Sequence, residues 1–154
     1  MEELADLVPS LRNVVARPGT FADFFPETTE DDLIAVLVDG LAECHMEGLL
    51  LRYEADEAGT LTPALTSGQG ALVLLFAGVR LIRAELFNRA TSRKYVASSA
   101  SFEEIQATNI LRDIMRELKE QKARVVDAQA TGGSGHAFFM ADQYLARLSV
   151  AQGW

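Results

Sequence analysis

The sequence predicts a mainly α-helical fold, a small helical bundle of three long helices with a C-terminal arm. Two observations carry this prediction. Apolar residues recur at the 3.6-residue period of a helix in three long stretches, at about residues 29–51, 66–89 and 105–127. In addition, 49% of the 154 residues are hydrophobic, so a single domain of this length can bury a core.

The first long helix has a clear start signal. Thr28 or Thr29 can cap it, and acidic residues fill its first turn, where the helix dipole favours negative charge. Small residues recur every fourth position at Gly40, Cys44 and Gly48. Because glycine weakens a helix, this spacing predicts a close crossing with the second helix, whose own small stripe includes Gly70 and Gly78.

The second long helix, from about Thr66 to Asn88, contains the longest apolar run of the chain, Ala71–Val79. Arg80 and Arg83 interrupt the run well short of the ~20 residues that a membrane helix needs, so we expect a buried helix and no membrane span. The acidic N-terminus is unlike a basic secretory signal, which favours a soluble intracellular protein.

The connecting segments carry turn signals. Glu2–Val8 predicts a short helix ending before Pro9, and residues 14–26 predict an irregular stretch whose phenylalanines pin it to the core. A polar loop is expected at residues 54–63. Residues 92–105 fit either a helix cap at Ser101 or a short β-hairpin with strands at Arg93–Ala97 and Phe102–Ile105.

The chain divides into a helical domain, residues 1–130, and a Gly-rich linker with a C-terminal docking arm, residues 131–154. Glycines at 132, 133 and 135 allow the arm to leave the domain, and the residues beyond are too apolar for a solvated tail. We predict that the arm binds another chain; the alternative is that it folds back onto its own domain. The predicted partner-binding residues are Phe138, Phe139, Met140, Tyr144, Leu145 and Leu148.

Charge is unevenly distributed along the chain. Residues 1–60 carry 14 acidic and 3 basic side chains, whereas residues 61–126 carry 6 acidic and 10 basic ones. Copies of such a chain can attract one another through unlike surfaces, although the two halves can equally attract each other within one fold. The subunit contacts predicted on this basis are Asp39, Glu43 and Glu47 with Arg93 and Lys94.

No catalytic, cofactor or metal site is predicted. The chain has two histidines, His45 and His136, and one cysteine, Cys44, which is too few for a structural zinc site and excludes an internal disulfide. Ser67–Gly70 opens a helix but lacks the lysine and glycine spacing of a phosphate-binding loop. The net charge of −8 also argues against general nucleic-acid binding.

Three stretches together resemble the head-to-tail adaptor (connector) proteins of long-tailed bacteriophages, in particular siphophages of actinobacteria. They read EDDLI and LAECHMEG within residues 30–48, LTSGQGALVLLFAGVRLIRAEL in residues 65–86, and SRKYV and ILRDIM in residues 92–96 and 110–115. The resemblance covers roughly residues 27–125. It lies in the order of the helices and in their residue patterns.

The resemblance implies a structural protein of the virion neck that is assembled in the host cytoplasm and has no enzymatic activity. Twelve copies would form a ring between the capsid portal protein and the next neck or stopper protein, with DNA only as passing cargo. Adaptors tend to have a hairpin before the last long helix, which favours the hairpin for Arg93–Ile105. Some grip the portal with a C-terminal arm, and residues 131–154 match that arm in position and character.

Two other classes remain open at this stage. One is a stopper or other tail-completion protein, a class that tends to be rich in β-structure. The other is a bacterial helical regulator or DNA-packaging accessory protein, for which Arg89, Arg93 and Lys94 form the basic cluster that could meet phosphate.

Overall fold

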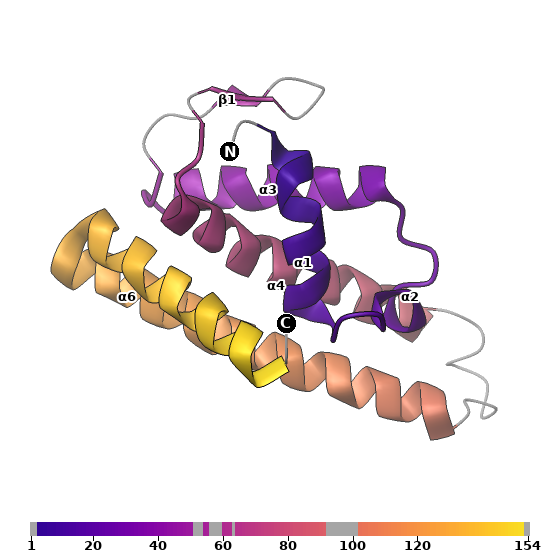
Figure 1. The fold of residues 1–154 in the computed structure, drawn as a ribbon. Coiled ribbons are helices and arrows are strands. Elements are labelled where there is room, and N and C mark those ends of the chain that lie inside the picture. Colours follow the sequence, from indigo (N-terminus) through magenta and orange to yellow (C-terminus); the bar gives the residue numbers. More distant parts are fainter. Residues whose placement is uncertain (1–2, 51–53, 56–59, 63, 92–101, 153–154) are drawn as a thin grey trace.

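Helices dominate the computed structural model, which describes residues 3–50, 54–55, 60–62, 64–91 and 102–152. The prediction of a mainly α-helical bundle is confirmed (Figure 1). In chain order the elements are the 3-10 helix η1 (Leu4–Leu7), α1 (Val8–Val15), α2 (Phe21–Phe24), α3 (Glu30–Met46), β1 (Glu54–Ala55), β2 (Leu61–Thr62), α4 (Ser67–Thr91) and α6 (Phe102–Gln152).

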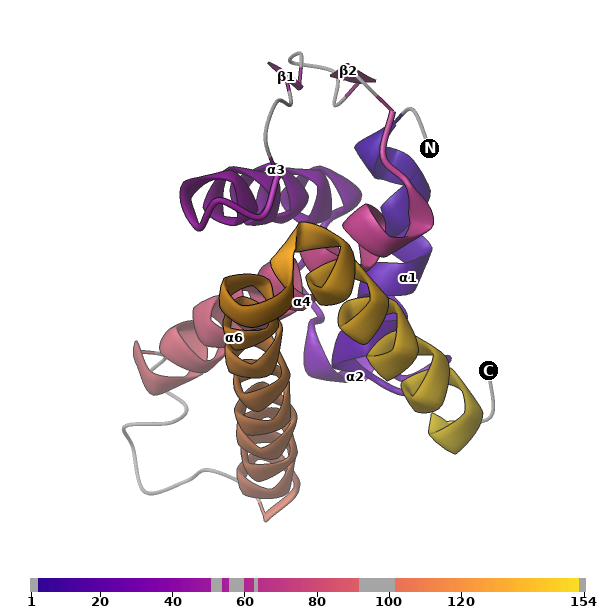
Figure 2. The ribbon, with the colours of Figure 1, turned by 90° about the vertical axis from the view of Figure 1, so that its left-hand side faces the viewer.

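Helix α4 is the central element of the bundle. It packs mainly against α6 and α3, and α1 also lies against it (Figures 1 and 2). All nine residues of the apolar run 71–79 are buried, because the covering helices lie on several sides of α4. The prediction of a buried helix for this run is therefore confirmed.

The N-terminal region is more regular than the sequence predicts. The sequence predicts a helix that ends before Pro9, but Pro9 lies in the first turn of α1, where a missing N–H leaves no helical hydrogen bond unmade. Phe25 is buried and stacks on Phe21 with ring centroids 4.8 Å apart, so these phenylalanines do pin their segment to the core.

Helix α3 begins and ends with well-defined caps. The Thr29 hydroxyl accepts a hydrogen bond from the Asp32 backbone N–H, and the Asp32 carboxylate accepts one from the Thr29 backbone N–H at 2.9 Å. The helix ends at Met46 rather than near residue 51. Gly48 follows with a φ of 74°, and the Leu49 N–H returns to the Cys44 carbonyl, as in a Schellman cap.

The small residues of α3 and α4 meet only in part. A Cβ atom on Gly40 would lie 3.0 Å from the Cβ of Ala77, so the close crossing predicted at Gly40 is confirmed. The prediction is wrong for Gly78, where a Cβ would lie 3.1 Å from Leu118 of α6 and 3.3 Å from Val14 of α1. A helix covered on several sides needs small residues on more than one face.

The β-structure lies elsewhere than predicted. A two-stranded antiparallel ladder pairs Glu54 with Thr62 and Ala55 with Leu61, within the stretch expected to be a polar loop. Phe102–Ile105 is helical, so the return strand predicted there is wrong. The rest of that predicted hairpin, and the alternative cap at Ser101, fall on residues 92–101, outside the described residues.

Helix α6 continues well past the predicted end at residues 127–130. It runs from Phe102 to Gln152 with one non-helical residue, Gly133, whose φ and ψ are 79° and 179°. The chain turns sharply at this glycine, and Figure 2 shows the part after the turn diverging at an angle from the part before it.

Candidate interaction surfaces

In the single chain, the predicted docking arm packs against the helical domain of the same chain. Ala137 and Ala141 are fully buried in the hydrophobic core. Phe139 is 58% exposed. The other predicted partner-binding residues are partly buried against the core; they are Phe138, Met140, Tyr144, Leu145 and Leu148. The fold-back arrangement is thus the one present here, and binding of these residues to another chain stays a prediction.

The seat of this segment is formed by the start of α4 and the first part of α6. A Cβ on Gly68 would lie 2.9 Å from the Cβ of Phe138, so only glycine allows this approach. The Ser67 hydroxyl donates to Asp142 Oδ1 at 3.2 Å. Burial raises the pKa of Tyr144, and the nearby Glu117 carboxylate raises it further.

These contacts also explain the sequence Ser67–Gly70. The side chain of Gln69 accepts a hydrogen bond from the Thr66 N–H at 2.9 Å, which satisfies the start of α4 locally. The carboxylate of Asp142 and the ring-bearing residue Phe138 lie against the same turn. The glycine at 68 therefore serves helix packing, and the Asp142 carboxylate lies at the turn where a phosphate-binding loop would hold its anion.

The acidic face of α3 is paired with basic residues of the same chain. Arg80 of α4 lies 3.7 Å from Asp39 and 3.5 Å from Glu43, and Lys122 of α6 donates to Glu43. The Lys122 ammonium also lies 4.4 Å from the centre of the Phe76 ring. Glu43 therefore links α3, α4 and α6.

The predicted subunit contacts are accordingly divided. Asp39 and Glu43 already have partners within the chain, which is what attraction between its two halves would produce. Glu47 is exposed. Arg93 and Lys94 fall outside the described residues, so contacts of these five residues with a neighbouring copy remain a prediction.

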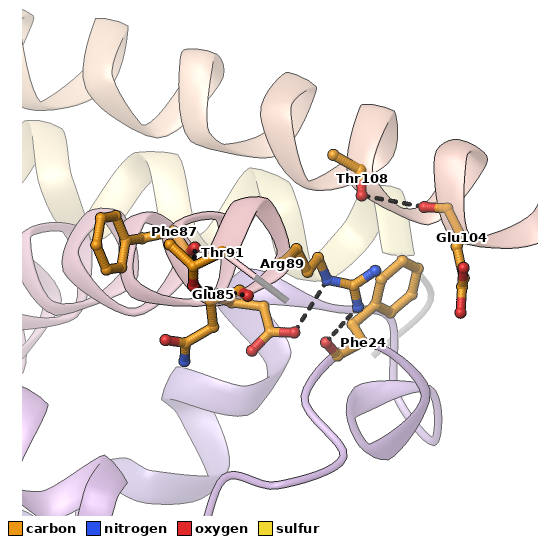
Figure 3. Close-up of polar contacts among 8 residues, drawn as sticks. Phe24, Glu85, Phe87, Arg89, Thr91, Glu104 and Thr108 are labelled. Atoms are coloured by element: carbon orange, nitrogen blue, oxygen red, sulfur yellow. Dashed lines mark hydrogen bonds and ion pairs between the residues drawn. The ribbon is translucent and has the colours of Figure 1, made fainter. Parts of the chain in front are cut away.

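Arg89, part of the basic cluster that could meet phosphate, is held inside the chain. Its Nε donates to Glu85 Oε1 at 2.9 Å and its Nη2 to the Phe24 carbonyl at 2.8 Å (Figure 3). Both charged side chains are only 15% exposed. Burial raises the pKa of Glu85, an effect that the Arg89 charge opposes. The pair ties the end of α4 to the end of α2, while Phe87 points away from it (Figure 3).

Cys44 and His45 are neighbours with separate structural roles. Cys44 is buried, and burial together with the Glu43 charge raises the pKa of its thiol. The His45 Nδ1 donates to the Leu50 carbonyl at 2.7 Å and so supports the end of α3. Within the described ranges, no group of three or more His, Cys, Asp or Glu side chains could hold a metal ion.

A shallow hollow of about 340 Å³ lies along the first part of α6. It combines two isoleucines with charges of both signs, and two of its lining residues, Asp113 and Arg116, form an ion pair at 2.8 Å. Glu117 also lines it, so the hollow adjoins the seat of Tyr144. Its lining residues are Ile110, Asp113, Ile114, Arg116, Glu117 and Glu120.

Among the helices in the described part of the chain, every one is too short or too polar to cross a membrane. Comparisons with protein-family models, with curated proteins and with solved structures return no match to this chain.

Proposed function

We propose that this chain is a structural subunit of a bacteriophage neck, a head-to-tail adaptor. Copies of it would form a ring that joins the capsid portal protein to the next neck protein, and the ring would surround the passing DNA. The proposal starts from the resemblance carried by residues 30–48, 65–86, 92–96 and 110–115. Residues 92–96 fall outside the described residues, and the other stretches lie mainly on α3, α4 and α6, the three helices that make up most of the bundle.

The observation that carries the proposal is the C-terminal segment beyond Gly133. It is a helix with an apolar face, attached to the bundle through a single non-helical glycine. Its aromatic residues are unevenly covered, since Phe139 is 58% exposed while Phe138 and Tyr144 are half-buried. Aromatic anchors of this kind are typical hot spots of protein interfaces. The resemblance implies that some adaptors grip the portal with such a segment.

The charge of the chain fits a conduit for DNA. A net charge of −8 repels phosphate, so DNA would pass the ring without adhering to it. The same charge argues against the DNA-packaging or regulatory alternative, for which retardation of DNA in a gel at moderate salt is the direct check. The β-rich stopper class is disfavoured by the mainly helical fold.

The test is binding of the full-length chain to portal-bearing capsids from the phage genome that encodes it. We expect rings at the portal vertex by electron microscopy. Phe139→Ala should weaken binding on the order of thirtyfold, the loss typical of an interface hot spot. Met46→Ala is the matched control, because Met46 is 85% exposed on a different helix.

Wild-type protein that does not bind a portal would refute the adaptor proposal. If the wild type binds and Phe139→Ala binds equally well, the adaptor role stands but the C-terminal segment does not grip the portal.

A further inference from the structure

The turn in α6 depends on the backbone of one residue. Gly133 is the sole non-helical residue within α6, and a Cβ placed on it would meet no atom within 4 Å. Thr131, Gly132 and Gly133 are all exposed. The positive φ of Gly133 therefore makes the turn possible, and the contacts of the residues beyond it hold the turn in place.

Beyond the turn, residues 134–152 fit a seat that the rest of the chain provides. Ala137 and Ala141 are fully buried, Phe138 lies against Gly68, and Asp142 accepts from Ser67. These contacts join the segment to α4 and to the first part of α6. Gly133 is the hinge residue that separates the segment from both. A segment from a second copy could make the same contacts without any new surface.

We propose that residues 134–152 exchange between two copies of this chain. When Gly133 takes helical dihedral angles, α6 becomes one continuous helix of 51 residues, about 75 Å long. Each copy's segment then occupies the seat between Ser67 and Glu117 of the other copy. The partner that fits this surface is thus a second copy, and the exchange is a domain swap across the hinge at Gly133.

The balance between the two forms depends on residue 133 and on concentration. The closed form makes the same contacts within one chain, without the loss of translational and rotational entropy that accompanies dimerisation. It therefore dominates in dilute protein. A φ of 79° with a ψ of 179° is essentially restricted to glycine. Any L-residue with a side chain at 133 disfavours the turn and favours the continuous helix. The proposal does not rest on the adaptor function, since it concerns the purified chain alone.

The experiment compares Gly133→Ala with Gly135→Ala in the full-length chain. Both glycines have open space for a Cβ, but only Gly133 has a positive φ. Light scattering across a concentration series should show that Gly133→Ala forms a dimer. Its dissociation constant should be about a hundredfold below that of the wild type, roughly tenfold for each of the two hinges in the dimer. Gly135→Ala should match the wild type.

Crosslinking identifies the exchanged contact. A chain carrying Ser67→Cys is mixed with a chain carrying Asp142→Cys, both in the Gly133→Ala background, and treated with a short bis-maleimide. Cys44 is buried and does not interfere. A covalent heterodimer is expected, whereas the two cysteines placed in one wild-type-hinge chain should give an intrachain link.

A monomeric Gly133→Ala chain would overturn the proposal, and so would a dimer without the heterodimer crosslink. If Gly133→Ala does not fold, the same single-cysteine chains with the wild-type hinge decide the matter. They are unfolded, mixed and refolded together at high concentration, and absence of the heterodimer crosslink then refutes the exchange.

Discussion

Leu118 and Ile110 illustrate how far residue periodicity determines burial. Both lie on the apolar side of the same predicted helix. In the structure Leu118 is fully buried against Gly78, whereas Ile110 is 40% exposed beside the hollow on α6. Periodicity identifies the apolar face of a helix. How much of that face is buried depends on where the neighbouring helices end.

We therefore expect Leu118→Ala and Ile110→Ala to differ strongly. Leu118→Ala removes buried methyl groups and leaves a cavity at the crossing of α4 and α6, which should cost about 2–5 kcal/mol of unfolding free energy. Ile110→Ala, in the same helix, should cost less than about 1 kcal/mol because its side chain is already half in water. Urea denaturation of the two variants measures both values, and equal losses would contradict this assignment of burial.

At the scale of elements, the N-terminal cap of α3 was predictable, whereas its C-terminal end and the docking of the C-terminal segment were not. The cap of α3 could be found from sequence because Thr29 and Asp32 are three positions apart and bond to each other's backbone and side chain. The helical role of Pro9 was missed because a proline in a first turn looks the same in sequence as a helix stop. The seat of the C-terminal segment was missed because Ser67 and Asp142 are 75 positions apart.

The capping box should give α3 a defined pH dependence. Hydrogen bonds from Thr29 lower the pKa of Asp32 below its ordinary 3.8, so its contribution to stability is present above that value and is lost as pH falls through the lowered pKa. Asp32→Asn should therefore be less stable than the wild type at pH 6, and the difference should vanish in strong acid.

Asp31→Asn is the control for this prediction, because Asp31 shares the first turn and its dipole but not the reciprocal bonds with Thr29. Thermal unfolding of the three proteins at several pH values tests it. Equal losses for the two variants at pH 6 would assign the effect to the helix dipole alone.

For the whole molecule, the acidic and basic parts of the chain meet inside the fold. Glu43 is the shared point, since both Arg80 of α4 and Lys122 of α6 pair with it. Composition could predict that the two parts attract each other, but it could not tell attraction within one chain from attraction between copies. The side chains of Glu43 and Lys122 are mostly buried, so solvent and salt screen this pairing less than they screen a surface ion pair.

Glu43→Gln should lower the unfolding free energy by about 1–2 kcal/mol, because the mostly buried Lys122 loses the Glu43 counter-charge and Arg80 keeps only Asp39. Glu47→Gln is the matched control, because Glu47 directly follows the last residue of α3 and is exposed to solvent; it should change stability by less than about 0.5 kcal/mol. Denaturation at low and high salt measures both variants. A loss for Glu47→Gln as large as that for Glu43→Gln would show that net charge, and not this pairing, sets the stability.

The central position of α4 has a consequence for how the protein is made. When Thr91 has left the ribosome, the run of buried residues 71–79 is already synthesised, but the part of α6 that covers it, including Leu111, Leu118 and Val125, is not. Helices α1 and α3 alone leave that side of α4 in water. The nascent chain therefore passes through an interval in which an apolar helix is uncovered, and this interval is where chaperone binding or aggregation would act.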